Sequence, residues 1–525
     1  MYPRHPVYKI IKTSFPFFDF KNKQRELEFS FKPQMKSTYA SILKLLQSVS
    51  DQDGLYFSTT RDLTQRIIHD IGGKAKTKTT SCGEELPLNC IDRTKFLINH
   101  HAKSNIDFNF DLESPPKFMI DAIQGYHSSK MLKISDASIY IEFTYRRLQN
   151  NNGRRFFNRG IDGKGFPANF VEVEMLLKYN NRSFVFYITR GSIPIVFSQL
   201  PRPLSREKFQ IVNDLQQNAT DIENHLNLLY DEYGPNMLLI SLLDHCGYES
   251  PLSRAFNDAI YFLLQRRDMN EKLKFINYDF HSETKGMQYD NIYQLLESFK
   301  EFNSETSYYE FDEELNNIRK QSGVCRVNCV DSLDRTGVVV NMILKYVFTD
   351  FLKKLDIIET NGDLPPSIDS YLRNIFADSS DLLSLQYSGT MANKSDFTRT
   401  GIRTNYGKMN DMYTSTRRKL FSLTTDPQVE DSYRIFLGKA DLGHYFRSSS
   451  IFYPYFTNLL TNEILYIILC FTFLFGSTSL IRSIFSRNSS WDRIKVSLTF
   501  TAVSAYILNK FSSRLILMPR FLKRN

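Results

Sequence analysis

One stretch in the second half of the chain, residues 323–348, limits the possible folds more than any other. Its first part, Gly323-Val-Cys-Arg-Val, alternates apolar residues in the manner of a β-strand. Its last part, Val338 to Phe348, is apolar and long enough for a buried helix. We therefore predict an α/β fold with α+β character, in which helices flank a central mixed sheet and a loop joins this strand to a helix N-terminus.

The loop between this strand and this helix carries Cys329 and, six positions later, Arg335. A loop that closes onto a helix N-terminus points several backbone N–H groups into one concavity, which attracts an anion and stabilises a thiolate. The planar guanidinium of Arg335 can bind two phosphate oxygens. Cys329 can then attack phosphorus and form a phosphocysteine that water hydrolyses. The pattern predicts phosphatase chemistry that requires no metal ion and no organic cofactor.

The spacing Cys-x5-Arg alone is common by chance, and a cysteine at a strand end is often just a small buried apolar residue. The flanking residues are more specific. From Arg326 to Thr336 the string Arg-x-Asn-Cys-x-Asp-x-Leu-Asp-Arg-Thr resembles the signature of the Sac-domain phosphoinositide phosphatases. A similar string at Asn89-Cys90 has its Cys and Arg only three positions apart, too close to surround a phosphate, so Cys90 is interpreted as structural.

Resemblance to the same family continues outside the signature, from about residue 50 to residue 440. The segments that carry it are Leu55–Thr64, Ala168–Glu174, Thr189–Ile195, Asn277–Met287, Asp381–Thr390 and Ser395–Gly401. It implies a β-rich N-terminal Sac domain over residues 1–118, packed on a catalytic phosphatase domain over residues 119–447. The polar residues 70–116 are predicted to form mostly loop.

Each polar residue of the signature has an expected role. Cys329 is the nucleophile, Arg335 the phosphate clamp, and Thr336 is placed to hydrogen-bond the thiolate or the loop backbone. A leaving inositol oxygen needs a proton, and Asp331 is the candidate donor. Asp334 could equally orient the neighbouring arginine or fix the loop.

Two further loop residues, Ser332 and Leu333, are assigned to substrate binding. The family usually has Asn after Arg-Thr, where this chain has Gly337. Glycine weakens the first helical turn by up to about 1 kcal/mol but leaves every reactive group in place, so we expect activity to be retained. His281, which precedes the signature, could assist the chemistry, but the preferred prediction is a core histidine bonded to a backbone group.

A second cationic segment holds five arginines within fourteen residues, from 146 to 159. Such a charge run is ordinarily a solvated surface. The corresponding loop of the family is basic too, although its usual Ser-Arg-Arg opening is Tyr-Arg-Arg here. We therefore predict a surface that faces the lipid headgroup or the membrane. The substrate-binding residues expected there, with one lysine from another family segment, are Arg146, Arg147, Arg155, Arg159 and Lys285.

Charge is distributed unevenly along the chain. The net charge is +9, and the residues from Arg482 to the end contribute nine Lys and Arg against one acid, Asp492. A basic block around apolar segments suits an anionic membrane better than nucleic acid, for which no motif is present. The six cysteines lack paired spacing and no signal peptide is apparent at the N-terminus, which indicates a reducing, cytosolic setting for the catalytic domain.

Residues 448–525 are predicted to anchor the chain in a membrane. Residues 464–481 are uncharged and just long enough to span a bilayer of ~30 Å. Residues 496–509 are shorter, and either span as the second half of a hairpin or lie in the interface. Membrane-bound members of the family carry two C-terminal spans, so the resemblance implies a transmembrane helical hairpin, multi-pass insertion in the endoplasmic reticulum or Golgi membrane, and a cytosolic catalytic domain.

Three functions of different classes are compatible with these observations. The first is a phosphoinositide phosphatase that hydrolyses phosphatidylinositol 4-phosphate, with the 3-phosphate and 3,5-bisphosphate within the family's range. The second is a catalytically silent scaffold that binds phosphoinositides or tethers membranes, against which the intact Cys329, Asp331 and Arg335 count. The third is a protein tyrosine phosphatase, which shares only the Cys-x5-Arg chemistry.

Overall fold

The computed structural model describes residues 7–10, 45–49, 52–71, 77–79, 85–87, 94–104, 120–134, 136–202, 206–285, 292–312, 317–359, 362–440 and 498–499. The chain divides into two compact units. The first comprises residues 1–14, 50–198 and 209–414, and the second residues 15–49, 199–208 and 415–525.

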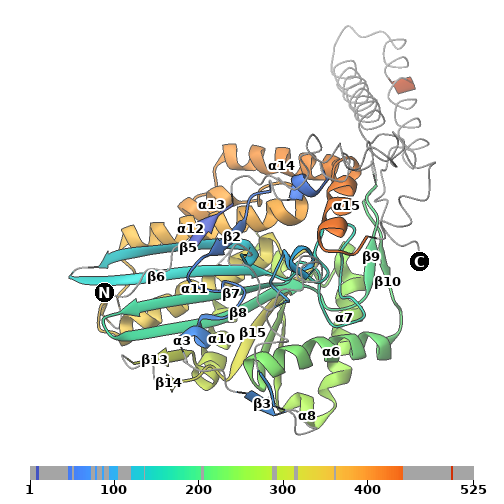
Figure 1. Cartoon of the computed structure of the whole chain (residues 1–525). Helices are drawn as coiled ribbons and strands as arrows, with labels where there is room; N and C mark the ends of the chain where they lie inside the picture. The colour runs from blue at the N-terminus through green and yellow to red at the C-terminus, as the bar shows by residue number, and fades with distance from the viewer. Residues whose placement is uncertain are drawn as a thin grey trace, which may run out of the picture. The chain divides into compact units, whose positions relative to one another are not determined.

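Within the described part of the first unit, eleven strands form one mixed sheet (Figure 1). In spatial order the strands of its main path are β1 (Val7–Lys9), β2 (Leu55–Ser58), β5 (Ala122–Ile134), β6 (Ala137–Arg147), β7 (Val171–Tyr179), β8 (Arg182–Ser192), β15 (Gly323–Cys329), β11 (Asn236–Ser241) and β12 (Leu273–Asn277). The strands from β1 to β8 pair antiparallel, whereas β8, β15, β11 and β12 are parallel. The remaining two are β13 (Tyr309–Phe311) and β14 (Asn317–Arg319).

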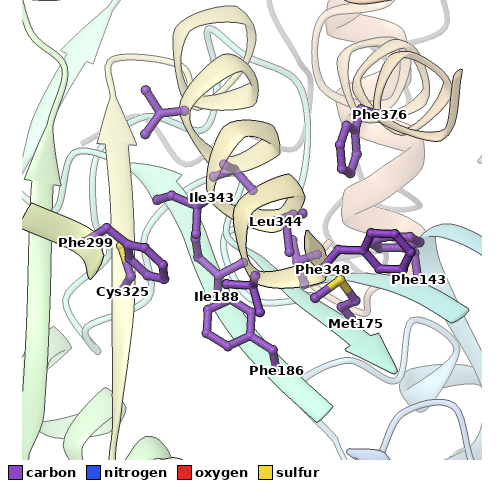
Figure 2. Packing of buried hydrophobic residues seen from close by; sticks show 14 of the residues in the cluster. Phe143, Met175, Phe186, Ile188, Phe299, Cys325, Ile343, Leu344, Phe348 and Phe376 are labelled. Carbon is purple, nitrogen blue, oxygen red and sulfur yellow. The ribbon is translucent and has the colours of Figure 1, made fainter. Parts of the chain in front are cut away.

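Helices cover both faces of this sheet. One face packs against α10 (Tyr293–Thr306), α11 (Asp334–Lys354) and α12 (Pro366–Ser388). Figure 2 shows Ile343, Leu344 and Phe348 of α11 among the apolar side chains of the sheet. The other face packs against α6 (Leu215–Tyr233) and α7 (Ser250–Leu264). The predicted mixed sheet flanked by helices is confirmed.

The central strand β15 is buried along its whole length. Its side chains alternate between the two faces, as those of any strand do. Cys325, Val327 and Cys329 belong to the apolar cluster that contains α11. Arg326 is on the opposite side and donates to His225 of α6, with Nε 2.7 Å from Nε2. Because Cys325 and Val327 anchor the strand under α11, they fix where its last residue, Cys329, emerges.

The sheet crosses the boundary predicted at residue 118. Strand β2, from the N-terminal segment, pairs with β5, which leads through the antiparallel strands to β8 and β15. Buried ion pairs add to the stability of this part of the sheet. Arg61 contacts Glu142 at 2.6 Å, and Arg146 contacts Glu172 at 3.1 Å and Glu174 at 2.9 Å. The β-rich N-terminal segment therefore extends the catalytic sheet.

Local sequence explains where the helices begin. Phe209–Ile211 forms the short strand β10, which pairs with β9 (Phe197–Gln199), and α6 begins at Leu215. Asp214 caps α6, since its carboxylate accepts from the backbone N–H groups of Gln216 and Gln217. The segment 70–116 was predicted to be mostly loop. Its described parts include the end of α3 (Ile67–Ile71) and a hairpin of β3 (Thr77–Thr79) and β4 (Glu85–Pro87).

The remaining elements are short, apart from one long helix. They are the 3-10 helix η2 (Gly247–Glu249), α8 (Arg267–Asn270), α9 (Phe280–Glu283), α13 (Ser395–Thr400), α14 (Asn405–Leu423) and α15 (Asp426–Phe436). The last of these belongs to the second unit, where Ser48 Oγ donates to Ser432 Oγ at 3.0 Å.

The predicted membrane anchor lies outside the described residues, except for residues 498–499. In the part of the chain that the structure describes, none of the helices combines the length and the hydropathy that crossing a bilayer requires. The prediction of two spans over 464–481 and 496–509 thus stays a prediction, as does the structural role of Cys90, which is also outside the described residues.

Candidate active site

The signature forms a tight loop of four residues between Cys329, which ends β15, and Asp334, which begins α11. Ser332 has a positive φ of 52°, a conformation that costs free energy for a residue with a side chain. This backbone turn brings the Ser332 N–H to 3.1 Å from the Cys329 Sγ. A backbone donor pointed at sulfur stabilises a thiolate. The predicted arrangement of strand, loop and helix N-terminus is therefore present.

Buried side chains hold the outer side of this loop. Ser192 Oγ donates to the Val330 carbonyl at 2.7 Å, and Asn169 Nδ2 donates to the Asp331 carbonyl at 3.0 Å. Arg190 donates to the carbonyls of Ser332 and Leu333. These hydrogen bonds hold the loop in the conformation in which the Ser332 N–H faces the Cys329 Sγ.

Arg190 was not among the site residues predicted from the sequence, although it lies in a segment that resembles the family. Burial lowers the pKa of its guanidinium, and the nearby Cys329 acts in the opposite direction. Arg190 is thus in direct contact with the loop that carries Cys329. The first turn of α11 passes close by, because a Cβ at Gly337 would be 3.3 Å from Ser380 Oγ and 3.7 Å from Arg190 Nη1. The missing side chain at Gly337 thus fits a crowded position.

Arg335 is held by two carboxylates. Its Nη1 is 2.8 Å and its Nη2 is 2.7 Å from the two oxygens of Glu249, and Nη1 is 3.2 Å from Asp244 Oδ1. Burial alone would lower the pKa of Arg335, but Cys329 and these two acids together raise it. Among the described residues its Nε has no hydrogen-bond partner. The described acceptors thus contact Arg335 only through its two terminal nitrogens.

The arginine-rich segment meets the signature loop at Asp331. Arg155 Nη1 is 3.3 Å from its carboxylate, and Arg159 forms a second, closer ion pair with it. Both guanidinium groups also lie over the ring of Phe156, at 4.5 and 5.0 Å from its centroid. Two of the four predicted substrate-binding arginines are thus next to the signature loop.

The other two arginines are elsewhere. Arg146 is completely buried in its ion pairs with Glu172 and Glu174, and Arg147 is buried with Nη2 3.0 Å from the Gly153 carbonyl. The prediction of an exposed, headgroup-facing surface is wrong for these two, because carboxylates and carbonyls inside the fold neutralise or bind them. Lys285 is exposed but does not line the cavity described below.

A cavity of about 260 Å³ opens over the loop. Of the predicted residues it contacts Cys329, Asp331, Leu333, Asp334 and Arg335. Two others lie behind the wall and are fully buried, Ser332 and Thr336. The hydrogen bond predicted from Thr336 is not formed, since its buried Oγ1 has no partner among the described residues and Ser332 N occupies the position beside sulfur.

Two groups at the cavity differ from expectation. Asp334 Oδ1 accepts from the backbone N–H of Asn393 at 2.9 Å, so it holds the segment before α13, a contact that the sequence did not predict. His281 was predicted to be a core residue, which is wrong. Its side chain is 59% exposed, lines the cavity, and has Nδ1 2.7 Å from Asp244 Oδ1. Asp244 thus joins His281 to Arg335. No sequence motif linked these residues, because Asp244 follows a different strand of the sheet.

Known proteins are similar to this chain over most of its length. A family model described as the SacI homology domain matches residues 1–285. A Drosophila melanogaster protein named phosphatidylinositol-3-phosphatase SAC1 is 31% identical over 403 residues, which are 76% of this chain and 65% of that protein. An uncharacterized protein of Schizosaccharomyces pombe is 30% identical over 499 residues, 92% of this chain and 79% of that protein.

The Saccharomyces cerevisiae protein named phosphatidylinositol-3-phosphatase SAC1 is 29% identical over 428 residues, 78% of this chain and 65% of that protein. The chain thus spans slightly less than two thirds of the length of the fly and budding yeast relatives. More than half of the chain matches the family model, and most of it aligns with the fission yeast relative. The chain belongs to the SacI homology domain family.

Proposed function

We propose that the chain is a phosphoinositide phosphatase that acts through a phosphocysteine intermediate. The observation that carries the proposal is the arrangement of Cys329 and Arg335 in one cavity, with a backbone N–H 3.1 Å from the sulfur. Relatives named phosphatidylinositol-3-phosphatase and phosphoinositide phosphatase support the substrate class. The sequence ranks the 4-phosphate first, whereas two of those names specify the 3-phosphate, so both monoesters are proposed substrates.

In the proposed reaction the Cys329 thiolate attacks phosphorus while the bond from phosphorus to the inositol oxygen breaks. The loop N–H groups and the Nε side of Arg335 stabilise the charge on the phosphoryl oxygens. Asp331 gives its proton to the leaving oxygen and can then accept one from the water that hydrolyses the phosphocysteine. The second step releases inorganic phosphate and restores the thiolate.

We propose that Asp331 becomes protonated when a phosphate group of the substrate competes with it for two arginines. Arg155 and Arg159 pair with its carboxylate in the structure. A phosphate group of the substrate is a stronger partner for a guanidinium, since it accepts more charged hydrogen bonds. When the substrate takes over these arginines, Asp331 loses the charges that favour its ionised form. Headgroup binding thus prepares the proton donor.

The proposed cellular setting follows from the sequence and the relatives. Membrane insertion through residues 464–481 and 496–509, in the endoplasmic reticulum or the Golgi, would keep a cytosolic catalytic unit near its lipid substrate at high local concentration. The proposed partner is therefore the membrane lipid itself, and no nucleic acid is involved.

Phosphate release by the purified full-length chain in detergent tests the function. The substrates are short-chain phosphatidylinositol 4-, 3- and 5-phosphates, the 3,5-bisphosphate, and a phosphotyrosine peptide, each with a metal chelator present. Release from inositol lipids that Cys329→Ser abolishes and Cys246→Ser preserves supports the proposal, because Cys246 is an exposed cysteine outside the cavity. Release from the peptide alone indicates a protein phosphatase, and silence of a folded chain on every substrate indicates a scaffold.

A further inference from the structure

The first half of helix α14, which lies in the first unit, carries an exposed apolar stripe. Three of its residues follow helical spacing on α14: Tyr406, Met409 and Tyr413. With Ile402 just before the helix and Met412 beside them, they form what we term the Tyr-Met face. Their exposed fractions lie between 62% and 80%, and Met391 nearby in the chain is 61% exposed. Scattered apolar residues are normal on surfaces, but a run at helical spacing is not.

The opposite side of α14 is polar and turned inward. Gly407, Asp411 and Thr414 recur at the spacing of one helical face, and none of them is exposed. Arg403 forms ion pairs with Asp411, at 2.5 Å, and with Asp396, at 2.6 Å. This helix therefore has the reverse of the usual pattern, in which apolar residues face the core and polar residues face water. The reversal indicates that another molecule covers the exposed apolar side of the helix.

The charges around the Tyr-Met face indicate what covers it. At about 100° per residue, Lys408 and Arg417 of α14 fall on the two edges of the apolar stripe. The one carboxylate of the helix, Asp411, already binds Arg403 and the backbone N–H of Lys394. An apolar stripe with basic edges fits the interface of an anionic bilayer, where tyrosine also sits at headgroup level.

The face is also next to the cavity. Met391 directly precedes Ala392, Asn393 and Lys394, which line the cavity, and Asp411 accepts from the Lys394 N–H at 3.0 Å. α14 is thereby tied to the cavity wall. A bilayer in contact with the Tyr-Met face would hold headgroups beside the cavity that contains Cys329.

We propose that the Tyr-Met face is a membrane-docking surface that enters the interfacial region of an anionic bilayer and orients the active site toward its lipid. The inference deepens the proposed function. It differs from the predicted C-terminal spans, because it concerns a surface of the catalytic unit and acts on orientation rather than on attachment.

Lipid quenching of tryptophan fluorescence tests the contact. The chain has one tryptophan, Trp491, so Trp491→Phe provides a silent background. The full-length protein is reconstituted in phosphatidylcholine vesicles with 30% phosphatidylserine as the probe membrane, some lipids carrying bromine in their acyl chains. With Tyr406→Trp we expect bromolipid to reduce emission at least twofold. With the control Tyr261→Trp, at an exposed tyrosine of α7, we expect almost no change. Equal quenching at the two positions, or none at position 406, overturns the proposal.

Activity provides the second test. The double variant Tyr406→Ser/Met409→Ser is expected to hydrolyse lipid in these vesicles about five- to tenfold more slowly at low lipid density. Its rate on a water-soluble short-chain substrate is expected to equal that of the unchanged protein. Equal loss on both substrates would mean a damaged fold, and loss on neither overturns the docking surface. A dimer that the double variant converts to monomer, measured by light scattering, assigns the face to a second copy and also overturns the proposal.

Failure of the proposed function is distinguishable from failure of this inference. The quenching experiment contains no phosphoinositide and does not depend on turnover. Quenching at position 406 in a protein that hydrolyses none of the lipids would retain the docking surface and reject the enzyme. Turnover of soluble substrate without quenching at position 406 would retain the enzyme and reject the docking surface.

Discussion

Glu249 binds both terminal nitrogens of Arg335, with its carboxylate oxygens 2.7 and 2.8 Å away. The two residues come from different segments, η2 and the start of α11. The pairing fixes the guanidinium by its two terminal nitrogens. We propose that Glu249 positions the arginine for the phosphate without touching the substrate itself.

Replacing this carboxylate tests the relationship. Glu249→Gln retains the shape, but its amide nitrogen is a donor, so one of the two charged hydrogen bonds from Arg335 is lost and the other has a neutral acceptor. We expect kcat with a short-chain inositol lipid to fall about tenfold, equivalent to about 1.4 kcal/mol, with a small change in KM. Steady-state kinetics measures both values. Glu271→Gln, at an exposed glutamate outside the cavity, is the matched control. A faster variant would show that Glu249 instead withholds Arg335 from the phosphate.

Arg190 supports a second prediction, about the loop beneath the nucleophile. Arg190→Met removes the donors for two buried carbonyls, and each unsatisfied group costs about 1–3 kcal/mol. We expect a lower unfolding temperature and a loss of activity of at least a hundredfold. Arg190→Lys keeps the charge without the fork and is expected to recover part of both.

The test of positioning is the rate at which iodoacetamide alkylates Cys329, followed by mass spectrometry of the peptide that contains it. This rate should fall in Arg190→Met at a fixed pH, because the cation that favours the thiolate is gone. An unchanged alkylation rate together with a lower unfolding temperature would limit Arg190 to a structural role.

Asp331 yields a prediction about the leaving group. Asp331→Asn cannot donate a proton, so we expect the hydrolysis of inositol lipids to slow by about 10²–10⁴-fold. An aryl phosphate whose phenol is acidic needs little protonation and should lose less than tenfold. Asp334→Asn, at the neighbouring carboxylate that binds the Asn393 N–H, should affect both substrates equally. If Asp331→Asn also slows both substrates equally, the proton comes from another group.

The buried ion pairs of the sheet predict how stability depends on pH. Burial alone would raise the pKa of Glu142 and Glu172 above the ordinary 4.5. Arg61 instead lowers the pKa of Glu142 to about 2. Arg66 and Arg146 do the same for Glu172, whose pKa is also about 2. A carboxyl group with a lowered pKa in the folded state stabilises the fold fully above its unfolded pKa. The contribution, about 3 kcal/mol for each group, is lost as the pH falls from about 4.5 toward 2.

Urea unfolding between pH 6 and pH 3 measures this effect. We expect the midpoint to decrease steadily below pH 4.5. Glu142→Gln should lower the midpoint at pH 6 and flatten its dependence on pH, because the group that titrates is gone and Arg61 loses a partner. A midpoint that is independent of pH down to 3 in the unchanged protein would contradict the prediction.

The sequence predicted the elements whose pattern is local. Strand β15, helix α11 and the loop between them follow from alternation, apolar length and the spacing of Cys329 and Arg335. The mixed sheet flanked by helices was predicted as well. These features depend on residues that are close together in the sequence, so a local sequence pattern predicts them.

Long-range pairing was beyond such patterns. Glu249 and Asp244 reach Arg335 across about ninety residues, and Arg190 reaches Ser332 across 142. Arg146 and Arg155 both look like surface charges in the sequence, yet one is in the core and one is beside Asp331. What separates them is the position of glutamates on the neighbouring strand β7, which only the sheet register reveals.

The place of β15 in the sheet has a consequence for how the protein is made. Its two neighbours, β8 and β11, are complete by Ser241, but they pair with β15, which begins only at Gly323. While the ribosome synthesises the intervening residues, the nascent chain has two long apolar strands with unsatisfied backbone edges, which invite aggregation. The last central strand to be translated both closes this gap and carries Cys329, the proposed nucleophile. The central sheet and the candidate active site are thus completed by the same segment of the chain.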